Sequence, residues 1–201
     1  MERNFTVGHS GKAETRTEVL GVRARLDPVE LASRDASRCA RVLRRLKELG
    51  PAVVACHVSV EPEPDTATLL EELVEAGVGV LLPWLADRES VRTPRWCWWA
   101  GEPLAAGYGG IPTPDSPPAP VDVLSGADLN ILPGLAGTAT GVRLGRGGGW
   151  YDRALLHART STPRWLLLND AEVRDQLPAD PWDQSVTALV TERRWIDCRS
   201  E

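Results

Sequence analysis

Apolar side chains recur at helical spacing near the start of the chain. Over residues 12–26 valines and leucines fall on one side of a helix, and a second helical pattern follows. Asp27 and Pro28 suit the N-cap and first turn of this second helix, because aspartate accepts backbone N–H bonds and proline has no N–H to leave unpaired. Gly50, which precedes a proline, marks the end, so we predict a helix up to Leu49.

Short apolar runs, bounded by turn residues, alternate with helical patterns in the rest of the chain. They predict strands at Val53–Val60, Val78–Pro83, Arg95–Ala100, Ala127–Leu132, Arg164–Leu168 and Val186–Thr191. Further helices are predicted over Thr66–Ala76 with Asp65 as a cap, from about Trp150 to Arg159, and as a short piece near Ala171–Gln176. Strands that alternate with helices imply crossover connections. We therefore predict a mostly parallel sheet with helices on both faces.

Length and charge narrow the class of protein. A chain of 201 residues, with 42% hydrophobic and 25% charged residues, has the size and composition of one globular α/β domain. We assign residues 12–201 to that domain and residues 1–11, which show no periodicity, to a flexible N-terminal tail. The net charge of −5 argues against nucleic-acid or membrane partners. No run approaches the ~18 apolar residues of a transmembrane helix and no signal peptide is visible, so we expect a cytoplasmic protein.

The cysteines and histidines lack the spacing of a metal or redox site. The chain contains no C-x-x-C and no H-x-x-x-H pair, and we expect its cysteines to be reduced and mostly buried. Cys56 and His57 are adjacent, but neighbours in a strand point to opposite faces of a sheet. A Cys–His catalytic pair is therefore disfavoured.

The most informative segment is Pro133–Arg153, PGLAGTATGVRLGRGGGWYDR. It starts at the carboxyl end of a predicted strand, where ligands bind in open α/β sheets, and runs into a helix whose N-terminus favours an anion. Its glycines allow backbone N–H groups to wrap an anion closely. Arg143 and Arg146 add planar donors for phosphate or carboxylate, and Asp152 offers a hard oxygen ligand for Mg²⁺.

Two common phosphate-binding patterns do not fit this segment. Trp150 stands where the dinucleotide fingerprint needs its third glycine, and neither this loop nor residues 8–12 have Walker A spacing. A flexible glycine turn with a solvated arginine pair is the simpler alternative. Two arginines, consecutive glycines, an aromatic pair and an aspartate at a strand end favour instead an anion or nucleotide site.

The segment PGLA…G-x-RLGRGGGWYDR closely resembles the signature of the 5-formyltetrahydrofolate cyclo-ligases, also called methenyltetrahydrofolate synthetases. Three further elements are similar to motifs of that family, in the same order over residues 12–192. They are Lys12-x-x-x-Arg16 on a helix, Ser59-Val-Glu-Pro-Glu63-Pro-Asp-Thr66 after the first strand, and Asp183 ahead of Leu189-Val190-Thr191-Glu192.

The resemblance implies a three-layer α/β/α fold with a mostly parallel central sheet, of the NagB/RpiA/CoA-transferase-like kind. It implies an enzyme that converts a reduced folate, 5-formyltetrahydrofolate, to 5,10-methenyltetrahydrofolate with ATP and Mg²⁺, releasing ADP and phosphate. The γ-phosphoryl group is transferred to the formyl oxygen, N10 attacks the activated carbon, and phosphate leaves as the ring closes. We expect a monomer or a weakly associating homodimer.

The resemblance also implies roles for particular residues. Arg146, Lys12 and Asp152 are the expected catalytic residues, and Asp152 and Asp183 the Mg²⁺ ligands. The expected ATP-binding residues are Lys12, Arg16, Arg143, Leu144, Gly145, Arg146, Gly147, Gly148, Gly149, Trp150 and Tyr151. The expected folate-binding residues are Val58, Glu63, Arg146, Gly147, Gly148, Gly149 and Trp150. The simpler alternative for Lys12 with Arg16 is a solvated basic patch, which the scarcity of lysine disfavours. Without the resemblance, Asp183 would be a cap and Val58 a core residue. A cap is also the simpler alternative for Glu63, although Asp65 already fills that role.

The chain departs from the family pattern at three places. Gly137-Thr138 replaces a Phe-Asp pair, Trp150 replaces a tyrosine, and Thr113 stands where a glutamate is usual. We expect the first change to remove an aromatic wall and a carboxylate near the loop. Two alternatives therefore stay open: the same ATP site acting on another N-formyl or folate-like compound, and a non-catalytic nucleotide- or folate-binding protein.

Overall fold

The computed structural model describes residues 7–199, with side chains from residue 11 onward. Of the predicted N-terminal tail, residues 1–6 lie outside the described residues. Residues 7–11 belong to helix α1, which spans Val7–Arg23 and thus begins before the expected start at residue 12. This first turn consists mostly of glycine, histidine and serine, so no apolar periodicity predicted it.

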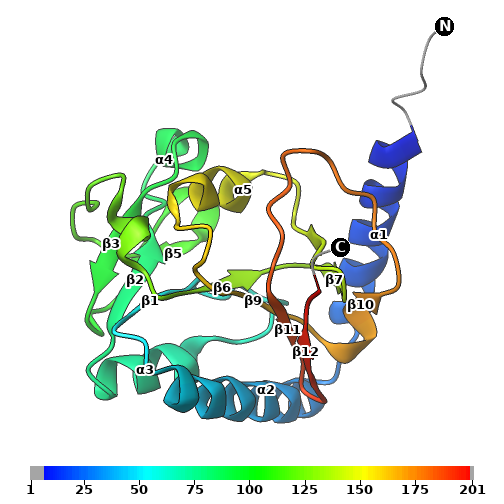
Figure 1. Cartoon of the computed structure of the whole chain (residues 1–201), viewed down its shortest axis with the longest axis horizontal. Coiled ribbons are helices and arrows are strands. Elements are labelled where there is room, and N and C mark those ends of the chain that lie inside the picture. The colour runs from blue at the N-terminus through cyan, green and yellow to red at the C-terminus, as the bar shows by residue number, and fades with distance from the viewer. Residues whose placement is uncertain (1–6, 200–201) are drawn as a thin grey trace, which may run out of the picture.

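A seven-stranded sheet forms the centre of the molecule (Figure 1). Its order is β12 (Trp195–Asp197), β11 (Ala188–Val190), β9 (Arg164–Leu167), β6 (Leu129–Pro133), β1 (Val53–Ala55), β2 (Gly79–Pro83) and β3 (Trp96–Trp99). The five inner strands are parallel, and the two edge strands, β3 and β12, pair antiparallel with their neighbours. The predicted α/β class with a mostly parallel sheet is confirmed.

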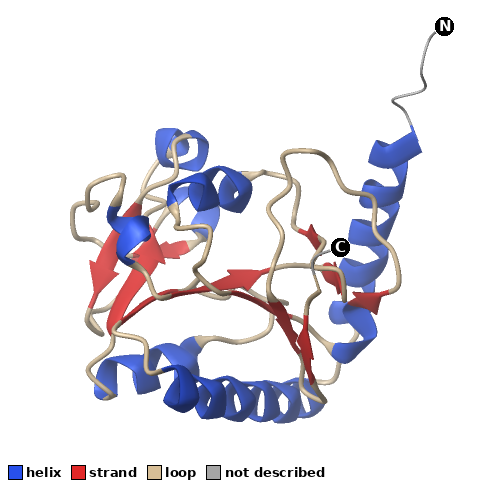
Figure 2. Ribbon diagram, in the orientation of Figure 1, coloured by secondary structure: helices blue, strands red, loops and turns tan. Residues whose placement is uncertain are grey.

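Helices cover both faces of this sheet (Figure 2). Helix α2 (Pro28–Leu49) and α3 (Ala67–Glu75) lie on one face. Helices α1, α4 (Arg88–Arg92) and α5 (Trp150–Ala154) lie on the other. Among residues 7–199, no helix is both long and apolar enough to cross a membrane.

The ends of α2 follow the predicted capping pattern. The side chain of Asp27 accepts hydrogen bonds from the backbone N–H groups of Val29 and Glu30, and Pro28 occupies the first turn. Gly50 adopts a left-handed conformation with φ of 59°, and its N–H donates to the carbonyl of Leu46. Local chemistry alone therefore fixes both ends of this helix.

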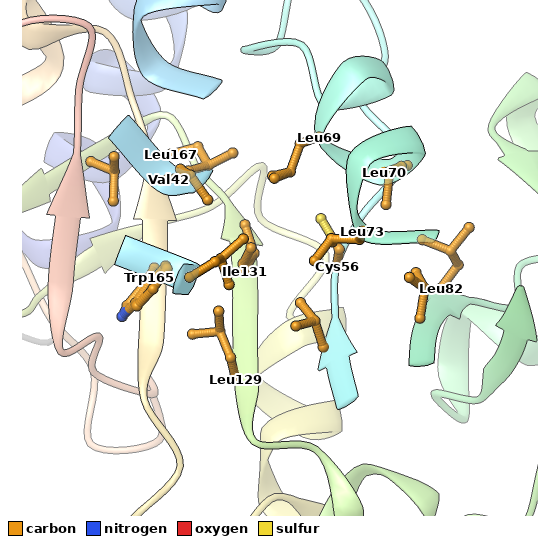
Figure 3. Packing of buried hydrophobic residues seen from close by; sticks show 14 of the residues in the cluster. Val42, Cys56, Leu69, Leu70, Leu73, Leu82, Leu129, Ile131, Trp165 and Leu167 are labelled. Carbon is orange, nitrogen blue, oxygen red and sulfur yellow. The ribbon is translucent and has the colours of Figure 1, made fainter. Parts of the chain in front are cut away.

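The larger part of the hydrophobic core lies between the sheet and the two helices α2 and α3 (Figure 3). Val42 of α2 and Leu69 and Leu73 of α3 pack on Ile131 and Leu167 of the inner strands. Two smaller clusters, around Leu81 and Leu166, lie on the opposite face beneath α5. The inner strands are buried on both faces, which is why they read as continuous apolar runs.

The first predicted strand is shorter than expected. We predicted Val53–Val60, but β1 ends at Ala55 and residues 56–66 form a loop. Side chains of the loop replace the ladder: the Thr66 hydroxyl donates to the His57 carbonyl and accepts from the Ser59 N–H, while Ser59 Oγ accepts from the Thr66 N–H. This hydroxyl clasp holds the backbone that follows β1.

Two small sheets and several short helical turns were not foreseen. One sheet contains β7 (Ala136–Thr138), β8 (Arg143–Leu144) and β10 (Val173–Arg174), and the other contains β4 (Ala105–Ala106) and β5 (Pro112–Thr113). The 3₁₀ turns are Tyr108–Gly110, Val123–Gly126, Leu155–His157 and Asp170–Glu172. The glycine-rich segment therefore passes through the β7–β8 hairpin before it reaches α5. The predicted helix to Arg159 ends at Ala154, and the piece predicted at 171–176 is a 3₁₀ turn followed by β10.

Candidate functional site

All the residues expected to bind ligands line one cavity of about 1120 Å³ on the face of the sheet that carries α1 and α5. They come from α1, the loop after β1, the segment from β8 to α5, and the turn at 180–184. They are Lys12, Arg16, Val58, Glu63, the ten residues Arg143 to Asp152, and Asp183. The structure therefore brings together side chains that lie far apart in the sequence.

Lys12 sits between two carboxylates on one side of the cavity. Its Nζ donates to Asp180 Oδ2 at 2.7 Å and to Asp183 Oδ2 at 2.6 Å, and its side chain is only 10% exposed. Burial alone would lower the pKa of Lys12, but the hydrogen bonds and charges of the two aspartates raise it above its usual value. The ammonium group is thus a permanent positive charge in the cavity wall.

Arg16 stands one turn further along α1 and fixes the start of the glycine-rich loop. Its Nε donates to the carbonyl of Gly145 at 2.9 Å. Gly147 has φ of 100°, and a Cβ there would lie 3.3 Å from Cζ of Arg16. Both the backbone conformation and the close approach of the guanidinium therefore require glycine at this position.

Arg143, Asp152 and Gln184 link the loop to the turn that carries Asp183. One terminal nitrogen (Nη2) of Arg143 donates to Asp152 Oδ1 at 2.7 Å, and the same oxygen accepts the N–H of Gln184 at 3.1 Å. The guanidinium also lies 5.9 Å from the ring centre of Tyr151. Asp152 and Asp183 are consequently neighbours at the cavity wall, because Gln184 directly follows Asp183.

Glu63 and Arg146 form an ion pair at another part of the wall. Arg146 Nε donates to Glu63 Oε1 at 2.9 Å, and Glu63 Oε2 accepts the N–H of Val60 at 3.1 Å. The carboxylate is 8% exposed and the guanidinium 47% exposed. Glu63 is therefore held in place by its own loop, while Arg146 is the more accessible partner on the glycine-rich loop.

Aromatic rings close the cavity near the start of α5. The Trp150 ring lies edge-on to the rings of Trp96 and Tyr151, with 5.3 Å and 4.8 Å between the ring centres. Its Nε1 donates a hydrogen bond to the carbonyl of Ser90 at 3.0 Å. Burial, with Glu63 adding to it, raises the pKa of the Tyr151 hydroxyl well above its usual value. Trp150 thus keeps an aromatic surface with a fixed orientation at the place of the usual tyrosine. Helix α5 has only five residues, so the predicted contribution of a helix N-terminus is reduced to one turn.

Two of the three departures from the family pattern lie outside the lining of the cavity. Gly137 is in β7, and the space that a side chain would need there is filled by Leu166, Leu168 and Leu189. Thr138 is buried, where its hydroxyl bonds to that of Thr140. The expectation that these residues remove a wall and a carboxylate of the site is therefore wrong, because leucines of the core fill the space beside Gly137 and Thr138 is buried outside the lining of the cavity.

Thr113 also lies outside the lining of the cavity, although its neighbours Ile111 and Pro112 belong to it. Its hydroxyl accepts the N–H of Leu85 at 2.9 Å and donates to the carbonyl of Pro83 at 3.3 Å. The residue ties β5 to the end of β2. Of the three departures, only Trp150 faces the cavity.

Gly137→Ala should destabilise the fold. A Cβ would meet Leu189 Cδ2 at 2.8 Å and Leu166 Cδ2 at 2.9 Å in a close-packed region. Overpacking of this kind costs about 1–3 kcal/mol. Urea unfolding of the variant should show this loss. Gly21→Ala is the matched control: it lies in α1 with open space around it, and alanine there should stabilise by up to about 1 kcal/mol. Equal stability of wild type and Gly137→Ala would contradict the packing described.

The residues of the cavity wall that were not expected from the sequence include His57, Leu156, Asp180 and Trp182. Asp180 precedes Asp183 in the same turn, and its backbone N–H donates to Asp183 Oδ2. The sequence feature that could have identified Asp180 as a site residue is therefore this pair of closely spaced aspartates. Cys56 and His57 do point to opposite faces, as expected. Cys56 packs in the core cluster against α2 and α3, and His57 lines the cavity.

His57 should make the stability of the protein depend on pH in the weakly acidic range. Burial lowers its pKa, with Arg23 adding to this, and the opposing influence of Glu63 and Asp65 is smaller. Between the depressed folded pKa and the ordinary value of 6.5, only the unfolded chain binds the proton. The free energy of unfolding is therefore highest above pH 6.5 and decreases as the pH falls from 6.5 toward the folded pKa of His57. Urea unfolding of wild type and His57→Phe at several values between about pH 5 and 7.5 measures this; parallel pH profiles would contradict it.

The fold and cavity define a class: an α/β protein whose large cavity carries cations and exposed backbone groups suited to an anionic ligand. Comparison with known proteins narrows this class. The model of the 5-formyltetrahydrofolate cyclo-ligase family matches residues 9–192. The chain belongs to the 5-formyltetrahydrofolate cyclo-ligase family.

Individual relatives agree with this assignment. The chain is 35% identical over 188 residues to the 5-formyltetrahydrofolate cyclo-ligase of Mycolicibacterium smegmatis, covering 92% of this chain and 95% of the relative. It is 33% identical over 141 residues to that of Escherichia coli, covering 69% and 76%. The structure of Aquifex aeolicus 5,10-methenyltetrahydrofolate synthetase superposes with a TM-score of 0.80 at 25% identity, over 94% of both chains.

Proposed function

We propose that this protein is an ATP- and Mg²⁺-dependent 5-formyltetrahydrofolate cyclo-ligase. The single observation that carries the proposal is the convergence on one cavity of Lys12 and Arg16 from α1, Glu63 from the loop after β1, and the whole segment 143–152. Each of these elements resembles a motif of the family, whose model matches residues 9–192.

Lys12, Arg16 and Arg143 would hold the phosphates of ATP. Phosphoryl transfer needs positioning and neutralisation of charge more than it needs covalent participation of the protein. Three fixed cations and the N–H groups of the loop at 145–149 supply both. The scarcity of lysine supports a particular role for Lys12, since the chain has only two lysines.

Asp152 and Asp183 fit the Mg²⁺ ion that such a reaction uses. The Oδ2 atom of Asp152 and the Oδ1 atom of Asp183 accept no hydrogen bond from residues whose contacts are described, while the other oxygen of each is engaged. Residues 11–199 contain no cluster of three or more metal-ligating side chains. Mg²⁺ commonly takes one or two carboxylates and completes its shell with phosphates and water. When bound, the ion would neutralise charge on the phosphates.

Glu63 and Arg146 would hold the folate. The carboxylate of Glu63 would accept hydrogen bonds from the N–H donors of the pterin ring, with Val58 and Trp150 contributing apolar surface. Arg146 pairs with Glu63 and belongs to the same loop as the expected phosphate contacts, so it would lie between the two substrates. From there its guanidinium would stabilise charge on the phosphoryl group as it moves to the formyl oxygen.

Ring closure would then follow from the chemistry of the formyl phosphate. The oxygen of an amide-like formyl group leaves poorly, whereas phosphate is a good leaving group. N10 would attack the activated carbon, its proton would be lost, and phosphate would depart with the former formyl oxygen. The part of the protein is to keep both substrates aligned and water excluded.

The test is the growth of methenyltetrahydrofolate absorbance from 5-formyltetrahydrofolate, with and without Mg²⁺ and ATP. The proposal expects turnover only with both, and none with an ATP analogue that cannot transfer its γ-phosphoryl group. ATP hydrolysis or binding that responds only to other N-formyl compounds would favour a different substrate. Nucleotide or folate binding without any turnover would favour a binding protein.

A further inference from the structure

His57 is a buried polar side chain in the wall of the cavity, and neither the sequence motifs nor the proposed mechanism uses it. It lies just after β1, which ends at Ala55, and directly follows Cys56. The residue is only 2% exposed. The Thr66 hydroxyl donates to its backbone carbonyl at 2.9 Å, so the hydroxyl clasp of Ser59 and Thr66 fixes the backbone that carries the ring. The position of the imidazole is therefore built into the fold.

One nitrogen of the His57 ring has a partner and the other does not. Nδ1 lies 3.4 Å from the carbonyl of Ile131, which can only accept, so the Nδ1–H tautomer is assigned by this contact. Nε2 is buried and has no hydrogen-bond partner among the described residues. A buried polar atom without a partner typically costs about 1–3 kcal/mol, so its retention in a cavity wall suggests that a ligand provides the missing donor.

The ring is neutral at physiological pH, because burial lowers the pKa of His57. In the Nδ1–H tautomer, Nε2 is an acceptor and requires an N–H or O–H group. Glu63, whose negative charge has a larger influence on the pKa of His57 than that of Asp65, already has both oxygens engaged, with Arg146 and with the N–H of Val60. A ligand with several N–H groups in this part of the cavity therefore needs a further acceptor, and a neutral imidazole adds one without a second negative charge.

We propose that His57 is a specificity-determining residue whose Nε2 accepts a hydrogen bond from an N–H group of the reduced pterin. The inference rests on the proposed function, since it takes the ligand at Glu63 to be the folate. His57 and Glu63 then accept hydrogen bonds from two different N–H groups of the same pterin ring system. A compound that lacks the N–H group facing His57 leaves Nε2 buried and unpaired, which disfavours its binding.

Binding of 5-formyltetrahydrofolate, measured by calorimetry without ATP, tests this in four proteins: wild type, His57→Phe, His57→Gln and His157→Phe. Phenylalanine keeps a flat ring but has no acceptor, and we expect its Kd to rise about 3- to 10-fold. Glutamine offers a carbonyl oxygen and should bind within about twofold of wild type. His157, exposed in the turn after α5 and outside the cavity, is the matched control and should show no change. Affinity for ATP should be unchanged in all four proteins.

A second measurement separates hydrogen bonding from shape. The chain has three histidines, so ¹⁵N labelling of histidine gives few signals, and His57→Gln assigns those of His57. The Nε2 resonance should move upfield on addition of 5-formyltetrahydrofolate and stay in place with ATP. Equal binding by wild type and His57→Phe, or equal losses in His57→Phe and His57→Gln with an unmoved resonance, would overturn the inference alone. A wild-type protein that binds no 5-formyltetrahydrofolate would instead contradict the proposed function, and this inference with it.

Discussion

Lys12→Met should lower kcat/KM by about 10²- to 10³-fold, the loss expected when one donor to a developing charge is removed. The ammonium is held by Asp180 and Asp183 at 2.7 and 2.6 Å, so no other cation can occupy its place without rearrangement. Methionine keeps the apolar stem of the side chain and removes only the charge. Two carboxylates would then face the phosphates unopposed, which adds repulsion to the lost contact.

Steady-state rates with varied ATP and varied folate measure this effect. The loss should fall on kcat and on KM for ATP, while the affinity for 5-formyltetrahydrofolate without nucleotide stays close to wild type. Lys47→Met is the matched control, because Lys47 is the other lysine and lies exposed in the last turn of α2. A Lys12→Met protein that is folded and retains most of its turnover would show that Lys12 is only a structural partner of the two aspartates.

Arg23→Met should destabilise the protein by about 3–5 kcal/mol, as expected when one partner of a buried ion pair is removed. The Arg23 side chain is fully buried and that of Glu172 is 6% exposed. Nε donates to Glu172 Oε1 at 2.7 Å, and one terminal nitrogen (Nη2) donates to Oε2 at 2.6 Å and to the carbonyl of Gly134 at 2.8 Å. The substitution leaves the carboxylate buried without its charge partner and frees the start of the glycine-rich segment from α1.

Urea unfolding of wild type and variant gives this difference directly. Arg25→Met, two residues further on and exposed, is the control and should change stability little. The double variant with Glu172→Gln should recover part of the loss, because the unpaired charge is then removed. A single variant as stable as Arg25→Met would mean that the ion pair does not anchor α1 to the rest of the fold.

Local signals were enough to predict the parts of the fold that local interactions determine. The ends of α2 are set by Asp27 and Gly50 within a few residues, and the inner strands are apolar because both faces are buried. The β7–β8 hairpin and the edge strand β12 were missed. Each has only two or three residues, and its pairing depends on partners that tertiary folding brings near. The early end of β1 has the same origin, since Thr66 replaces the ladder from across the loop.

The candidate site was predictable where one continuous segment carries the chemistry. The composition of the run from Arg143 to Asp152 predicts a ligand site by itself. The resemblance to the family added Lys12, Arg16, Glu63 and Asp183. The position of Asp180 beside Lys12 was not foreseen, because 168 residues separate them in the chain. The effect of Gly137 was misjudged for the same reason: the leucines that fill its space come from β9, β11 and the residue that follows β9.

Phosphorylation of the formyl oxygen predicts where that oxygen ends. In one turnover with Mg·ATP and 5-formyltetrahydrofolate labelled with ¹⁸O in its formyl group, mass spectrometry of the released phosphate follows the atom. The label should appear in inorganic phosphate, with one labelled oxygen for each molecule of methenyltetrahydrofolate formed. Unlabelled phosphate, with the ¹⁸O in water, would contradict transfer of the γ-phosphoryl group to the formyl oxygen in this cavity.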